Sequence, residues 1–398
     1  MNQLSDRLKA LSESETLAMA RASRELKAQG IDIVSLSLGE PDFNTPDFIK
    51  AAAKKAIDEN FSHYPPVSGY LELREAISRK FLRDNGLRYK PNQIVVSTGA
   101  KQSIANVIMS LVNPGEEVIL PAPYWVSYAE MIKLAGGIPV PVYAGIHQDF
   151  KVKAEQIAPF LNSKTKLLIF SSPCNPTGSV MSKQELEELA ALLRRFPDVI
   201  IISDEIYELI QFEGSHVSIA SLEGMYERTV TVNGLSKGFA MTGWRLGYIG
   251  APAWLAEACD KFQGQITSGT STITQRAAIS ALDADPSCLA DMTRAFKTRR
   301  DLMYRLLCEI PDVRVNLPQG AFYFFPDVST YLGKTGNGKV LNDTMELCHY
   351  LLYNFHVATV SGLAFGCPHS IRLSYATSDD QIIEAIKRLK QGLLSLTA

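Results

Sequence analysis

The chain has 398 residues, of which 46% are hydrophobic and 21% are charged, as in an ordinary globular protein. This length exceeds what one compact core usually holds, so we expect two domains, one of them smaller. The formal net charge is -2 with both signs interspersed, which excludes the electrostatic footprint of a protein that binds nucleic acid or anionic membranes. No apolar run could span a bilayer and the charged N-terminus does not resemble a signal peptide, so we expect a cytoplasmic location.

Cysteine and histidine residues are dispersed along the chain. The six cysteines include no CxxC pair, and the six histidines form no HExxH motif. A disulfide framework or a zinc site needs tighter grouping, so we expect free thiols in a reducing compartment and no protein-bound metal.

The first two thirds of the chain alternate between helical and strand-like patterns. Helices are predicted over Thr16–Gln29 and over Lys183–Arg195, the second with a capping box formed by Ser182 and Glu185. Four consecutive apolar residues, Val199–Ile202, are typical of a strand covered on both faces. The strand candidates are QIVVST, EVILP, KLLIFSS, VIIISDE, RTVTVNG and WRLGYIG. This alternation predicts an α/β domain whose mostly parallel sheet is covered by helices.

The pattern changes in the last third of the chain. Helices are predicted over Pro286–Glu309, around Met345–Asn354 and from Ser378 onward. Strand-like runs separate them, namely DVRVN, AFYFFPD, VATVS and SIRLSYA. We therefore predict a smaller α+β domain, with which the N-terminal segment packs. The large domain is expected to span residues 46–284, and the small domain residues 1–45 and 285–398.

Polar residues follow several of the predicted strands. Asp204 comes directly after the Val199–Ile202 run, at the carboxyl end where ligands of open α/β sheets bind. A carboxylate buried there needs a cationic or hydrogen-bonding partner, although Asp204 could equally be a helix cap. Tyr207 lies three residues further on, so both side chains could reach one cavity. Asn175, in FSSPCNPTG, is either ordinary turn material or another polar group at this edge.

Further strand ends add an anion site, an aromatic ring and two cations. Gly99 and Ala100 lie between a strand and a helix, where free N–H groups bind anions. Trp125 is either part of the core or a stacking surface, and Lys237 and Arg245 lie among small and apolar residues in VNGLSKGFAMTGWRLGY. A planar, phosphorylated, nitrogen-containing ring would use all of these groups. That description fits pyridoxal 5'-phosphate (PLP).

Seven motifs follow the order and spacing of a known family: LSLGEPDF, HYPP, PYWVSY, SPCNPTG, SDEIYE, NGLSKGFAMTGWRLGY and RLSYA. From about Leu17 to the final helix, the chain resembles the class I aminotransferases of PLP fold type I, especially the bacterial aspartate aminotransferases. The resemblance implies that fold, PLP as cofactor and a homodimer with shared active sites. It also implies transfer of the amino group of L-aspartate to 2-oxoglutarate by a ping-pong Schiff-base mechanism.

The resemblance implies roles for individual residues. Lys237 would form the Schiff base with the cofactor aldehyde, then act as general base and acid at the substrate Cα. Asp204 would pair with the ring nitrogen, and Arg372 would bind the substrate α-carboxylate bidentately. Tyr207 and Asn175 would contact the phenolic oxygen of the ring, and Trp125 would contact its face. Arg245, Gly99 and Ala100 would bind the phosphate, and Lys101 and Ser236 would also contact the cofactor. Tyr64 would contact the phosphate in the neighbouring subunit, and Gly39 the substrate α-carboxylate.

Two departures from the family pattern concern the second carboxylate and the phosphate. Animal-type aspartate enzymes bind the distal carboxylate with an arginine of the partner subunit, and no arginine lies between Lys261 and Arg276 here. In the bacterial subgroup a lysine at the position of Lys101 serves instead, helped here by Thr16. The alternative is that Lys101 is a solvated first-turn residue, although lysine is unfavourable at a helix N-terminus. Gly234 stands where some relatives have a serine that binds phosphate.

Other functions stay open from the sequence. Within the family, a prephenate, aromatic or other amino acid aminotransferase is the main alternative. A PLP-dependent lyase or synthase is next, because Lys237 and Asp204 serve those reactions too. A nucleotide-binding oxidoreductase is disfavoured because no GxGxxG motif opens a helix near the start, and a silent ligand-binding module would not need both Lys237 and Arg372.

Overall fold

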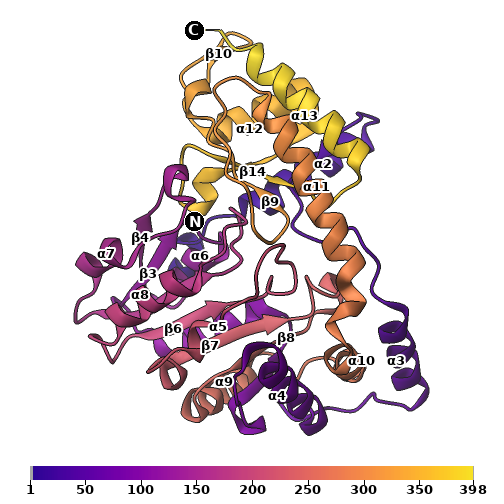
Figure 1. Ribbon diagram of the computed structural model, residues 1–398, viewed down its shortest axis with the longest axis vertical. Coiled ribbons are helices and arrows are strands. Elements are labelled where there is room, and N and C mark those ends of the chain that lie inside the picture. Colours follow the sequence, from indigo (N-terminus) through magenta and orange to yellow (C-terminus); the bar gives the residue numbers. More distant parts are fainter. Residues whose placement is uncertain (1–2, 398) are drawn as a thin grey trace.

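A seven-stranded sheet lies at the centre of the computed structural model, which describes residues 3–397 (Figure 1). Its strand order is β2-β8-β7-β6-β5-β3-β4. The neighbouring strands run parallel, except that β8 is antiparallel to both β2 and β7. The strands are β2 Ile94–Ser97, β3 Glu117–Ala122, β4 Ile138–Tyr143, β5 Thr165–Ser171, β6 Ile200–Asp204, β7 Thr229–Gly234 and β8 Gly247–Gly250. The predicted mostly parallel sheet is confirmed.

Helices cover both faces of this sheet, as the unbroken apolar strands predicted. In β5, Leu167 and Ile169 pack with α5 (Ala100–Leu111) and α9 (Ala253–Ile266) on one face. Leu168 of the same strand belongs to the cluster of α8 (Lys183–Leu193) on the other face. The predicted Ser182–Glu185 capping box begins α8. Beside β2 and β8 the second face is completed by α3 (Asp47–Asp58), α4 (Leu71–Asn85) and α10 (Thr272–Asp283).

Strand β4 is absent from the sequence-based strand candidates, and its two prolines explain why. Pro139 and Pro141 interrupt the strand pattern, because proline cannot donate a hydrogen bond to a neighbouring strand. The strand lies at the edge of the sheet and pairs only with β3. An edge strand tolerates a missing N–H on its open side, so the fold accommodates both prolines there.

The C-terminal part of the chain forms a second unit with its own core, above the sheet in Figure 1. A three-stranded antiparallel sheet, β13-β14-β9, lies in it. The N-terminal segment joins this unit, since β1 (Val34–Ser35) pairs with β12 (Val357–Ala358). Its other elements are α2 Glu15–Ala28, α11 Ala290–Cys308, α12 Thr344–Phe355, α13 Asp379–Leu394, β9 Tyr323–Phe324, β13 Val360–Ser361 and β14 Ile371–Ser374. The domain boundaries at residues 45/46 and 284/285 stay a prediction.

The long helix α11 begins four residues later than predicted. Pro286–Leu289 form a separate 3-10 turn, and the α-helix starts at Ala290. The Asp285 carboxylate accepts a hydrogen bond from the Ser287 N–H at 2.8 Å, so Asp285 caps this tight turn and not the α-helix. None of the helices described between residues 3 and 397 is long and apolar enough to cross a membrane.

Candidate active site

A cavity of about 340 Å³ lies at the carboxyl ends of the central strands, next to the second unit. It has the size and position of a small-molecule site in an α/β fold. Asp204, the last residue of β6, reaches it, as do Asn175 and Lys237 in the loops that follow β5 and β7, and β14 contributes Arg372. The other predicted site residues that line it are Thr16, Gly39, Ala100, Lys101, Trp125, Tyr207, Ser236 and Arg245.

Lys237 is a half-buried amine whose Nζ donates a hydrogen bond to the carbonyl oxygen of Gly39. Its pKa is lowered to about 8, first because the ammonium is desolvated and second because the positive charge of Arg372 is near. Arg245 lowers it further, whereas Glu40 and Asp204 oppose the shift. A lysine near neutrality in a cavity is suited to act as a nucleophile or base.

Asp204 is a buried carboxylate that touches two hydrogen-bond donors. The Tyr128 hydroxyl donates to Oδ2 at 2.6 Å, and the Ile206 N–H donates to Oδ1 at 3.2 Å. Burial raises the pKa of Asp204 to about 6, and these two donors counter part of that rise. The carboxylate is therefore ionised at neutral pH and can attract a cationic ligand atom into the cavity.

Arg372 is 2% exposed, and no carboxylate of residues 3–397 pairs with it. One terminal nitrogen donates to the Ser37 carbonyl at 2.7 Å and the other to Asn175 Oδ1 at 3.1 Å, while Nε has no partner among the described residues. The rings of Tyr323 and Phe365 flank the guanidinium, with centroids 4.7 and 5.0 Å from Cζ. Because a buried guanidinium needs a counter-charge, this arrangement indicates a binding site for an anion.

Arg245 and the start of α5 form a second place for an anion. Arg245 is exposed, and its terminal nitrogens donate to the carbonyls of Thr242 at 2.9 Å and Thr98 at 3.4 Å. A Cβ atom on Gly99 would lie 2.4 Å from Arg245 Nη2, so only glycine permits this approach. The N–H groups of Ala100 and Lys101, at the first turn of α5, have no hydrogen-bond partner among the described residues, and such groups bind anions.

Lys101 lies at the first turn of α5, beside the aromatic ring of Trp125. Its Nζ is 5.0 Å from the ring centroid, and none of the ion pairs among residues 3–397 includes it. Desolvation lowers the pKa of Lys101, and the charge of Arg245 lowers it further. Thr16 lines the same part of the cavity, and its buried Oγ1 has no hydrogen-bond partner within the described chain. Both groups are thus free to contact a ligand.

Two functional tyrosines were missed from the sequence. Tyr128, the partner of Asp204, lies three residues after Trp125 in the motif PYWVSY. Tyr323 lines the cavity, and its hydroxyl shares a 2.8 Å hydrogen bond with that of Tyr207. A Cβ on Gly39 would approach the Tyr323 oxygen to 2.6 Å, so Gly39 has to be small. The only signal for Tyr128 was its place in a motif already singled out, and Tyr323 appeared only within the strand candidate AFYFFPD.

Two of the predicted site residues do not line the cavity. Gly99 lies against the guanidinium of Arg245, and it affects the cavity only through that side chain. Tyr64 is 96% exposed, in a surface hollow with Pro65 and Gly269. Its predicted contact is with the neighbouring subunit, and it stays a prediction.

A cluster of possible metal ligands lies outside the cavity, formed by Glu205, Glu208 and His216. His216 Nε2 is 2.9 Å from a carboxylate oxygen of Glu205. The Lys80 ammonium is ion-paired with Glu208, so a side chain of the protein supplies the positive charge at this cluster.

Comparison with known proteins agrees with this fold and identifies the family. The family model for aminotransferase class I and II matches residues 31–389. The aspartate aminotransferase of Pinus pinaster is 45% identical over 99% of this chain and 81% of its own length. The aspartate/prephenate aminotransferase of Cereibacter sphaeroides is 45% identical over 97% of this chain and 98% of its own length. The crystal structure of the aspartate aminotransferase from Rhizobium meliloti has a TM-score of 0.96 at 38% identity and covers 100% of both chains.

The fold and these relatives together define an aminotransferase of fold type I. The chain belongs to the aminotransferase class I and II family.

Proposed function

We propose that the chain uses PLP to move the amino group of L-aspartate to 2-oxoglutarate, forming oxaloacetate and L-glutamate. The observation that carries this proposal is the buried guanidinium of Arg372, which has no carboxylate partner among residues 3–397 and lines the same cavity as Lys237. A substrate carboxylate would supply the missing negative charge and bring the α-carbon toward the amine.

The polar groups of the cavity fit PLP. Asp204 is a carboxylate without a cationic partner in ion-pair contact among the described residues, as the pyridinium nitrogen requires. Arg245, with the N–H groups at the start of α5, would hold the phosphate, and Trp125 would lie on the ring. Tyr207 and Asn175 would contact the ring oxygen. When bound, PLP supplies an aldehyde that condenses with amines and a protonated ring that draws electrons from the substrate Cα.

Lys237 would carry the proton transfer. An exposed lysine, with a pKa of about 10.4, holds its proton at neutral pH and cannot accept another. With a pKa of about 8, a useful fraction of Lys237 is neutral, and its Nζ can take the Cα proton and later return it. The Asp204 carboxylate, with a pKa of about 6, stays charged over the same pH range.

Lys101 would bind a second carboxylate on the substrate, with help from Thr16. Both residues line the cavity, Nζ of Lys101 has no ion-pair partner, and the Thr16 hydroxyl is unpartnered in the described part of the chain. Transfer to prephenate is the second candidate, favoured by the name of the Cereibacter sphaeroides relative. Prephenate is also a dicarboxylate, so the same lysine would serve it. A homodimer and a cytoplasmic location stay predictions.

Purified protein tests the proposal through its absorption and a panel of amino donors. We expect a yellow protein and the highest kcat/KM with aspartate and glutamate. Arg372→Ala should lower kcat/KM for every donor by about a hundredfold or more, since a bidentate charged contact is lost. Lys101→Ala should lower kcat/KM about tenfold for aspartate and much less for phenylalanine.

Lys54→Ala is the control, because Lys54 is an exposed lysine of α3 outside the cavity. Its activity should equal that of the unaltered enzyme. A protein that never takes up PLP would refute the proposed function. Unchanged aspartate turnover in Lys101→Ala would refute only the assignment of the second carboxylate.

A further inference from the structure

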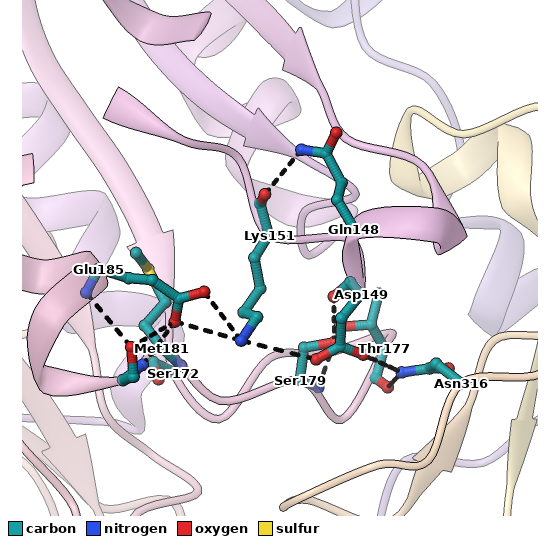
Figure 2. A network of polar contacts seen from close by, with 10 residues as sticks. Gln148, Asp149, Lys151, Ser172, Thr177, Ser179, Met181, Glu185 and Asn316 are labelled. Carbon is teal, nitrogen blue, oxygen red and sulfur yellow. Dashed lines mark hydrogen bonds and ion pairs between the residues drawn. The ribbon is translucent and has the colours of Figure 1, made fainter. Parts of the chain in front are cut away.

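Asn316 lies where the second unit meets the loop that carries Asn175 (Figure 2). Its Nδ2 donates to Asp149 Oδ1 at 2.9 Å and to the Thr177 carbonyl at 3.3 Å. Asn316 is 8% exposed and Thr177 only 1%, so water does not replace these bonds. The Ser179 hydroxyl, in the same loop, donates to the Asp149 carbonyl at 2.7 Å. One amide therefore joins Asp149 to the loop Cys174–Ser179.

Asp149 is itself fixed from its other side. Its Oδ2 lies 3.8 Å from Lys151 Nζ, and that ammonium lies 2.9 Å from Glu185 in the capping box of α8. Figure 2 shows Lys151 between the two carboxylates. Burial raises the pKa of Asp149, and the Asn316 amide and Lys151 oppose that rise. Asp149 is thus connected through Lys151 to α8, which packs on the large sheet.

Backbone hydrogen bonds and close packing hold the same loop against the segment 316–320. The Gly178 carbonyl accepts hydrogen bonds from the N–H groups of Gln319 and Gly320, each at 2.9 Å. Gly178 has a φ of +67°, and a Cβ there would lie 2.5 Å from the Cβ of Pro318. Such close packing transmits a shift of the segment directly to the loop.

The loop Cys174–Ser179 and the segment 316–320 both connect to residues of the active site. Within the loop, Asn175 Oδ1 accepts the 3.1 Å hydrogen bond from Arg372, the proposed carboxylate-binding residue. The segment 316–320 continues to Tyr323, whose ring lies on the guanidinium of Arg372 and whose hydroxyl meets that of Tyr207. The geometry of the guanidinium fork therefore depends on how loop and segment are held together.

We propose that Asn316 and Asp149 are a positioning pair, which fixes the loop Cys174–Ser179 so that Asn175 orients Arg372 for the substrate carboxylate. Neither residue lines the cavity, so the pair acts through Asn175 and touches no substrate. The inference rests on the proposed function, since it assigns the carboxylate to Arg372.

The first test removes the donor in the holoenzyme. Asn316→Ala should raise KM for aspartate about tenfold, while kcat changes less than about twofold, because a hydrogen bond to a charged acceptor is lost away from the reacting atoms. The dissociation constant of maleate, a dicarboxylate with no amino group, should rise by the same factor in calorimetry. Asn162→Ala is the matched control, since Asn162 Nδ2 donates to the Glu117 carboxylate at 2.7 Å at the opposite end of β3. It should leave maleate binding unchanged.

An exchange of donor and acceptor gives the decisive result. Asn316→Asp should weaken maleate binding, because two carboxylates then face each other. Adding Asp149→Asn restores one donor and one acceptor at the same positions, and asparagine accepts the φ of +55° at residue 149. We expect the double variant to recover most of the affinity, a coupling that independent stability effects do not produce.

The inference is overturned if Asn316→Ala lowers only the melting temperature, or if the double variant is no better than Asn316→Asp. Should Asn316→Ala not fold, the two nearly isosteric exchange variants decide alone. Failure of the proposed function has a different appearance, because the unaltered protein would then neither bind PLP nor transaminate aspartate.

Discussion

Lys237, the proposed catalytic lysine, has an energetic cost to the folded protein. Its pKa is about 8 in the fold against 10.5 for an unperturbed lysine, so the unfolded chain binds the proton more tightly. For such a group, stability rises with pH wherever the unfolded state carries more protons. The cost is therefore complete below pH 8, declines between pH 8 and 10.5, and vanishes above that range.

Replacing this amine with an apolar side chain should stabilise the cofactor-free protein. We expect Lys237→Met to raise the free energy of unfolding at pH 6.5 by up to about 3 kcal/mol, since each pKa unit corresponds to about 1.4 kcal/mol. At pH 9.5 the gain should fall by half or more. Urea unfolding at both pH values measures it, with Lys54→Met as the exposed control. An equal gain at both pH values would show that packing, and not the buried charge, is responsible.

Residue type marked several of the charged groups that line the cavity, but not the groups that orient them. A lysine, an arginine and a carboxylate in apolar surroundings are unusual enough to be noticed, which is why Lys237, Arg245 and Asp204 were found. Tyr128 and Tyr323 were not, because a tyrosine in an apolar stretch is most often part of the core. Their hydroxyl partners come from residues 76 and 116 positions away, and no local pattern encodes such pairs.

At the scale of elements, the junction of β2 and α5 depends on a glycine. Gly99 has a φ of +89°, and a Cβ there would lie 2.4 Å from Arg245 Nη2. Gly99→Ala should displace the guanidinium and weaken PLP binding at least tenfold, because a charged contact to the phosphate is lost. Titration of the cofactor-free protein with PLP, followed by absorption, measures the effect.

Gly86, the C-cap of α4, separates this effect from backbone strain. Its φ is +69°, and a Cβ there would meet nothing within 4 Å. Gly86→Ala should lose about 1 kcal/mol of stability, since alanine is strained in the left-handed region. Gly99→Ala should lose more, since a φ of 89° with a ψ of 155° is adopted almost only by glycine. Only Gly99→Ala should lose PLP affinity. Equal PLP affinities in the two variants would contradict the role given to Gly99.

The sequence predicted helices and strands correctly wherever the spacing of apolar residues matched the burial of the element in the fold. Strands β5 and β6 are buried on both faces, so their continuous apolar runs were unambiguous. Strand β4 was missed because it contains prolines, which cannot donate hydrogen bonds to a second neighbouring strand. A strand at the edge of a sheet has no neighbour on one side, and only the tertiary structure decides which strand lies at the edge. The start of α11 was misplaced by four residues, since proline is equally compatible with the first turn of a 3-10 and an α-helix.

At the scale of the whole molecule, the exposed side chain of Tyr64 bears on the predicted homodimer with shared active sites. The side chain is 96% exposed and beside a shallow hollow that includes Gly269 and Thr270. A large aromatic side chain so exposed is a candidate for an interface between subunits. The loop 269–271 also borders Arg245, so a partner bound at this hollow would lie near the proposed phosphate position.

Hybrid dimers test whether Tyr64 acts in the partner's site. Lys237→Ala and Tyr64→Ala should each have low activity as homodimers. In a hybrid of the two, one site combines an intact Lys237 with an intact Tyr64 from the other chain, while the second site lacks both. Random exchange of subunits in an equal mixture makes half of the dimers hybrid, so about a quarter of the sites are intact. Activity should therefore rise on mixing to roughly a quarter of that of the unaltered enzyme. Activity that stays at the mean of the two separate variants would show that Tyr64 does not serve the neighbouring chain.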